Sequence, residues 1–156
     1  MKKTFLTAIF IVATILGSNA QESTEPQYVI KVITSVESIV PSGLGRSRII
    51  SANADRDYKD FTTSQTKEDN TRNKSKRKDI RVKDFEETKL LNFFNIAGIR
   101  FQNIAANDVL IGSKLTDMLA NGWDLVFVTS AVESDAGKGD NKGIFITRYI
   151  FKKLVK

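Results

Sequence analysis

The sequence has neither cysteine nor histidine among its 156 residues. Without cysteine, disulfide bonds, thiolate metal ligands and a lipid-modified cysteine are excluded, so stability must come from burial. Without histidine, the commonest general base and a frequent zinc and copper ligand are missing. No Gly-x-Ser-x-Gly motif is present either. We therefore expect no catalytic residues, no cofactor and no metal site, although a lysine-assisted serine or a pair of carboxylates stays formally open.

Long apolar runs are also scarce, and the clearest one lies at the amino terminus. It extends from Phe5 to Leu16, follows Lys2 and Lys3, and precedes small and polar residues that end at Ala20. A membrane-spanning helix needs about 20 apolar residues, which this run does not supply. The pattern predicts a signal peptide over residues 1–20, cleaved after Ala20, and a periplasmic or secreted protein without a membrane span in its mature chain.

The mature chain, residues 21–156, has a length that suits one domain with a single core. Removing Lys2 and Lys3 lowers the formal net charge from +6 to +4, because the leader contains no acidic residue. A surplus of this size is ordinary for a soluble protein, and it also permits binding to an acidic surface.

Two β-hairpins and one helix are predicted. Residues 28–37 alternate between apolar and polar, and a Pro-Ser-Gly-Leu-Gly turn separates them from a second short strand at 46–51. A nearly continuous apolar strand, predicted to be central, covers 123–132, and a Gly-rich turn connects it to a strand at 144–152. Between the hairpins, an apolar stripe predicts a helix from near Asp108 to Asn121, capped by Asn107 or Asp108 and ended by Gly122. The predicted fold class is therefore α+β, with an antiparallel sheet of about four strands and one main helix packed on it.

Residues 55–78 are predicted to form a mobile, disordered insertion, because burial of their few apolar side chains cannot offset the loss of conformational entropy on ordering. Part of it is strongly basic, with five cations in seven residues: Arg72, Lys74, Lys76, Arg77 and Lys78. Such a run suits an anionic polymer or a lipopolysaccharide phosphate. Export and the lack of aromatic residues within the run disfavour a nucleic acid as the partner.

Two further groups of residues are candidate ligand-binding positions. Arg46 and Arg48 follow the glycines of the first turn and could grip a phosphate or carboxylate, although a plain hairpin turn also explains them. Thr34–Ser38 is echoed by Thr129–Ser134, so Glu37 and Glu133 could approach each other in one sheet. If Arg148 joined these residues, a concave polar pocket would result. The acidic residues at 133–141 match no standard calcium loop.

Three stretches together resemble a small bacterial domain family of unknown function. They are Tyr28-Val-Ile-Lys-Val-Ile, Lys114-Leu-Thr-Asp-Met-Leu-Ala-Asn-Gly-Trp-Asp-Leu-Val and Ile144-Phe-Ile-Thr-Arg-Tyr-Ile-Phe-Lys-Lys. Members of that family run strand, helix, Gly-Trp-Glu-Leu, strand and basic final strand, and the longer pattern is similar to exported uncharacterised proteins of Bacteroidetes-type bacteria. Asp124 stands where the family has Glu. The resemblance covers about half of the mature chain and implies a compact α+β fold without an assigned activity.

The sequence thus favours an exported, non-catalytic binding or interaction module. A binder of polyanions or of an envelope component, acting through Arg46, Arg48 and the 72–78 run, is the first alternative. A carboxylate-dependent enzyme is the second, and it requires Glu37 and Glu133 to meet in one cleft.

Overall fold

The computed structural model describes residues 27–39, 47–95, 97–133 and 143–155. The predicted signal peptide, the whole first hairpin turn, the second turn except Gly143, and Arg46 lie outside these residues. The chain divides into two units. One contains Tyr28–Lys153, and of the other only Gln27, Leu154 and Val155 are described. All interactions discussed below belong to the larger unit.

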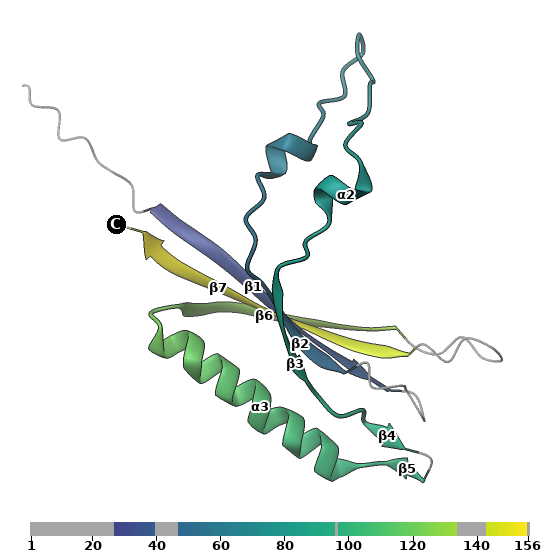
Figure 1. Ribbon diagram of the computed structural model, residues 1–156, viewed down its shortest axis with the longest axis vertical. Coiled ribbons are helices and arrows are strands. Elements are labelled where there is room, and N and C mark those ends of the chain that lie inside the picture. Colours follow the sequence, from purple (N-terminus) through teal and green to yellow (C-terminus); the bar gives the residue numbers. More distant parts are fainter. Residues whose placement is uncertain (1–26, 40–46, 96, 134–142, 156) are drawn as a thin grey trace, which may run out of the picture. The chain divides into compact units, whose positions relative to one another are not determined.

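A five-stranded sheet with the order β3-β2-β1-β7-β6 forms the centre of the fold (Figure 1). Its strands are β1 (Gln27–Ser38), β2 (Arg48–Ala52), β3 (Phe85–Lys89), β6 (Asp124–Glu133) and β7 (Ile144–Val155). The other elements are the 3₁₀ helix η1 (Tyr58–Phe61), the short helix α2 (Arg77–Ile80), the two-stranded sheet of β4 (Phe94–Asn95) and β5 (Gly98–Ile99), and the long helix α3 (Phe101–Ala120). The α+β class, both hairpins and the single main helix are confirmed.

The two predicted hairpins join through β1 and β7. The Ile39 N–H donates to the Gly143 carbonyl at 3.1 Å. Near the other ends of the strands, the Lys152 ammonium lies 5.0 Å from the centre of the Tyr28 ring. The strands therefore run antiparallel. The sequence had predicted four strands, and the fifth is β3, which pairs with β2 from Arg48↔Lys89 to Ala52↔Phe85. All five β3 residues are exposed, so the strand lacks the alternation from which strands are predicted.

Helix α3 ends where the sequence predicted but begins earlier. Its last turn forms a Schellman motif: the Trp123 N–H donates to the Met118 carbonyl, and the Gly122 N–H donates to the Leu119 carbonyl. Gly122 has a φ of 78°, which glycine adopts without a Cβ clash. The predicted cap at Asn107 or Asp108 is wrong, since the helix begins at Phe101. Asn107 instead lies in the helix interior and is fully buried.

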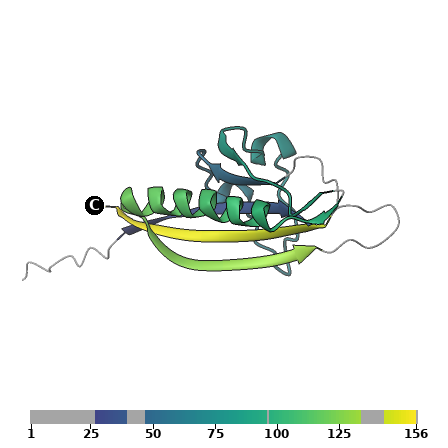
Figure 2. The same cartoon turned by 90° about the horizontal axis from the view of Figure 1, so that it is seen from below.

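The core lies between α3 and one face of the sheet (Figure 2). Its buried apolar residues are Ile33, Ile49, Leu90, Met118 and Phe151. On β1, the covered face carries Ile33, Ser35 and Glu37. The alternating apolar face of β1, from Tyr28 to Val36, is the one that α3 does not cover. Polar side chains are thereby brought into the layer between helix and sheet, where they need hydrogen-bond partners.

Strand β6 was predicted to be central, and this prediction is wrong. It is the outermost strand beside β7, and all ten of its residues are exposed. Five are large and apolar: Leu125, Val126, Phe127, Val128 and Val132. An uninterrupted apolar run normally indicates burial on both faces of a strand. Here β7 pairs with β1 on its other edge, so β6 has one neighbour among the described strands.

Residues 53–84 form an arm that starts and ends at the β2–β3 ladder (Figure 1). At its base, the Asn53 N–H donates to the Asp84 carbonyl at 3.0 Å. The arm contains η1 and α2, and neither helix has a buried residue. The structure thus gives the predicted insertion a defined path, no residue of 55–78 is buried, and its mobility in solution stays a prediction.

Candidate functional site

Asn107 connects three parts of the fold through its side-chain amide. Its Oδ1 accepts from the Leu91 N–H at 2.8 Å, and its Nδ2 donates to the Leu91 carbonyl at 2.8 Å. The same Nδ2 also donates to Glu37 Oε1 at 2.8 Å. The amide therefore pairs with a backbone segment much as a strand would, while holding a carboxylate of β1. Nothing in the sequence marked Asn107 for this role except an amide within an apolar helical stripe.

Burial changes the acidity of two side chains in this polar layer. Desolvation raises the pKa of Glu37, a hydrogen bond from Asn107 partly offsets that effect, and the negative charge of Asp108 adds to it. Desolvation also raises the pKa of Tyr149, with an opposing contribution from the Ser35 hydroxyl and further upward contributions from Glu37 and Asp108. Glu37 is 6% exposed and bonded to Asn107, so this carboxyl group serves the joint between helix and sheet.

The raised pKa of Glu37 predicts that the stability of the fold depends on pH. Because its pKa is higher in the folded state than in the unfolded state, the unfolded state loses this proton first as pH rises. The free energy of unfolding should therefore decrease as pH rises from the ordinary carboxyl pKa through the raised one. Urea unfolding from about pH 4 to about pH 8 should show this decrease in the wild type, and it should be smaller in Glu37→Gln. Glu68→Gln, in an exposed position of the arm, is the control. Equal pH profiles for wild type and Glu37→Gln would contradict the assignment.

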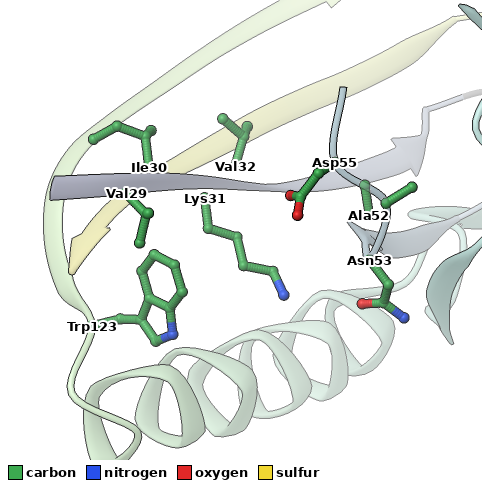
Figure 3. Close-up of a pocket in the computed structure, with 9 residues that line it drawn as sticks. Val29, Ile30, Lys31, Val32, Ala52, Asn53, Asp55 and Trp123 are labelled. Atoms are coloured by element: carbon green, nitrogen blue, oxygen red, sulfur yellow. The ribbon is translucent and has the colours of Figure 1, made fainter. Parts of the chain in front are cut away.

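A groove of about 470 Å³ lies beside the first half of β1. One wall is formed by Val29–Val32 and the other by Ala52–Asp55, with Trp123 at one end (Figure 3). The groove exists because β1 pairs with β2 only from Ile33↔Ser51 to Val36↔Arg48. Along Tyr28–Val32, no described strand pairs with this edge of β1. Its volume lies within the range of about 300–1,000 Å³ that is usual for ligand pockets.

Trp123 is held at its end of the groove from two sides. The Schellman motif fixes its backbone, and Lys153 lies over its ring at 5.8 Å from the centre. Lys153 is itself anchored, because its ammonium donates to the Asn121 carbonyl at 2.8 Å. In Figure 3, Val29 lies against the ring on the groove side. Trp123 follows the end of α3 and packs, partly buried, against the core between the helix and the sheet.

Lys31 extends into the middle of the groove between Trp123 and Asn53 (Figure 3). It makes no ion pair with any residue that the structure describes. The charge of Lys31 nevertheless acts on the nearby carboxylate of Glu86. The pKa of Glu86 lies below its usual value mainly because Lys114 bonds to it at 3.0 Å, and the charges of Lys114 and Lys31 add to this effect. Within the part of the chain that the structure describes, the groove therefore combines the Trp123 ring, the Asp55 carboxylate, a lysine without an ion pair, and a stretch of β1 backbone that no strand pairs.

The predicted pair of carboxylates does not form. Glu37 lies on the face that α3 covers, as its bond to Asn107 shows. Glu133 pairs in register with Ile144, one position along from the Val132↔Phe145 pair. Thr147 and Phe151 are buried against the helix, so the residues at odd positions of β7 face the helix and those at even positions face away from it. Ile144 is at an even position, and its partner Glu133 therefore also faces away from the helix. The two carboxylates lie on opposite faces of the sheet, so the cleft that an enzyme of this type requires is missing.

The predicted arginine cluster is not brought together either. Arg48 bonds to Glu87 of β3 at 2.8 Å. Arg148 is exposed on β7 opposite Thr129, two strands away from β2. Arg46 lies outside the described residues. The described members of the set are thus spread over the sheet.

The basic run of residues 72–78 lies on the arm, and all five of its cations are exposed. None of them forms an ion pair with a described residue. Local hydrogen bonds hold this part of the chain. Asn73 Nδ2 donates to the Asp60 carbonyl at 3.0 Å, and the Lys76 N–H donates to Asp79 Oδ2 at 3.1 Å. Two Ser-x-x-Lys sequences, Ser64–Lys67 and Ser75–Lys78, also lie on the arm, where these serines and lysines are exposed.

Within the described ranges, no group of three or more acidic side chains is placed to hold a metal ion. The helices of those ranges include none with the length and apolar character needed to cross a membrane. No protein-family model, curated protein or solved structure matches this chain. The family resemblance of the sequence therefore stays a prediction, and the groove and the arm are the features of the structure that bear on function.

Proposed function

We propose that the protein is an exported, non-catalytic binding module and that the groove beside β1 is its binding site. The observation that carries the proposal is one cavity that contains two anchoring side chains, Lys31 and Trp123, beside the Tyr28–Val32 backbone, which pairs on this edge with no described strand. Ligand sites combine apolar side chains with polar groups that fix the orientation of the ligand, and this groove contains both kinds: Val29 and Trp123 are apolar, whereas Lys31, Asn53 and Asp55 are polar. Export is supported by the apolar leader that precedes the mature chain, and a periplasmic or secreted location is part of the proposal.

A library of displayed seven-residue peptides tests this function. Selection on the purified protein should enrich peptides that bind the wild type, and Ala54→Tyr should weaken their binding at least tenfold by filling the groove. Ala105→Tyr adds the same side chain at an exposed position of α3 and should leave binding unchanged. Failure to enrich any peptide, or enriched peptides that bind both variants as well as the wild type, would contradict a binding site in this groove.

One observation favours a second candidate, a binder of polyanions. Residues 53–84 contain ten lysines and arginines and seven acidic residues, a net charge of +3, so the arm holds most of the +4 of the mature chain. A charge surplus concentrated on one exposed segment is the electrostatic pattern of proteins that bind polyanions. The partner would be an anionic polymer or an envelope component with phosphate groups.

A further inference from the structure

We infer that the groove beside β1 accepts an extended peptide as an added strand, with an acidic side chain of that peptide at Lys31. The inference rests on the proposed binding function and names its ligand class. It begins with the backbone: β2 pairs with four residues of β1, whereas β1 has 12 residues. From Tyr28 to Val32, no described strand pairs with this edge of β1, so its N–H and carbonyl groups are placed to bond an incoming chain.

The walls of the groove fit an extended chain better than a compact ligand. Each wall is a run of four consecutive residues, Val29–Val32 on one side and Ala52–Asp55 on the other. Neighbouring strands lie about 4.8 Å apart, so a peptide paired to β1 would continue the sheet where β2 has departed from it. At the departure point, Ala52 still pairs with Phe85 of β3 and no longer with β1.

Side-chain alternation then predicts which residues of the ligand matter. Val29 and Lys31 lie on the helix side of β1, two positions apart, next to Trp123 (Figure 3). Ile30 and Val32 point to the other face and are 61% and 43% exposed. A ligand strand should therefore carry an aromatic residue and an acidic residue two positions apart on the helix side, and apolar residues on the open side. The acidic residue would supply the partner that the Lys31 ammonium lacks among the described residues.

Synthetic peptides test the charge requirement. The probe is acetyl-Thr-Val-Phe-Val-Glu-Val-Thr-amide, and its counterpart has Lys in place of Glu. Trp123 is the single tryptophan of the chain, so its fluorescence reports binding in the groove directly. The wild type should bind the Glu peptide about tenfold more tightly than the Lys peptide, and Lys31→Glu should reverse this preference. Lys59→Glu, on the arm, changes the net charge equally and should leave the preference as it is.

Backbone methylation tests the strand mode. One version of the Glu peptide has N-methyl groups on its valines, and another has them on Phe and Glu. Because a strand directs alternate N–H groups to opposite edges, one version should bind as the parent does and the other at least tenfold more weakly. Equal affinities of the two versions would overturn strand addition, and equal affinities of the Glu and Lys peptides would overturn the charge requirement. If the synthetic peptides do not bind while library peptides still bind in the groove, the inferred acidic strand ligand is wrong and the proposed binding function stands. If neither the synthetic peptides nor any library peptide binds, the inferred ligand and the proposed function are both wrong.

Discussion

Replacing Asn107 with alanine is expected to lower the free energy of unfolding by roughly 2 to 4 kcal/mol. The substitution removes three hydrogen bonds at once, two to the Leu91 backbone and one to Glu37. It leaves the buried carboxylate without its amide partner, and an unsatisfied buried polar group costs about 1–3 kcal/mol. Alanine gains some helix propensity over asparagine, about 0.5 kcal/mol, which is too little to compensate.

Urea unfolding of wild type and Asn107→Ala measures this loss. Gln102→Ala is the matched control, because it removes another amide side chain from an exposed position of α3. The control should change stability by no more than about 0.5 kcal/mol. If Asn107→Ala were as stable as Gln102→Ala, the amide would not be the joint between helix, β1 and the Leu91 segment. A loss confined to Asn107→Ala would establish that joint.

Substituting serine for the five cations of the 72–78 run is expected to abolish retention on heparin at moderate salt. These side chains are exposed and make no ion pairs with described residues, so their charge is available to a polyanion. Each phosphate or sulfate contact releases counterions, and retention of the wild type should therefore decrease steeply as salt rises. The measurement is the salt concentration at which each protein elutes.

A variant with the same net charge separates the run from the total charge. It carries serine at five other exposed cations: Lys59, Lys67, Lys83, Lys89 and Arg148. This control should still be retained if the run itself is the binding element. Elution of both variants at the same salt concentration would contradict the polyanion candidate and leave the groove as the sole proposed site.

The sequence predicted those parts of the fold that depend on local chemistry. A glycine at position 122 predicted the end of α3, and its positive φ confirms that prediction. Turn residues predicted both hairpins. Strand β3 escaped prediction because an exposed, charged edge strand has no apolar alternation. The start of α3 was misplaced because asparagine is a common N-cap residue. The Asn107 side chain instead forms hydrogen bonds with residues outside the helix, Leu91 and Glu37.

The candidate site was less predictable, because it depends on which face and which edge of a strand are covered. The alternation of residues 28–37 would place Lys31 with the polar residues on the solvent side, yet α3 covers the face of β1 that carries Ile33, Ser35 and Glu37, and Lys31 lines the groove. The continuous apolar run of β6 indicated a central strand, although only the order of strands decides which one is outermost. Arg48 was chosen because it follows a glycine-containing turn, and Glu133 because its segment echoes Thr34–Ser38; strand pairing separated the two residues.

Amide hydrogen exchange at Val29–Val32 detects strand addition at the level of single residues. With the acidic peptide at saturating concentration, those amides of this segment that point into the groove should exchange more slowly, because the added strand bonds them. Amides of α3 should exchange as they do without peptide. Unchanged exchange across Val29–Val32, while the fluorescence of Trp123 still reports bound peptide, would contradict strand addition at this edge.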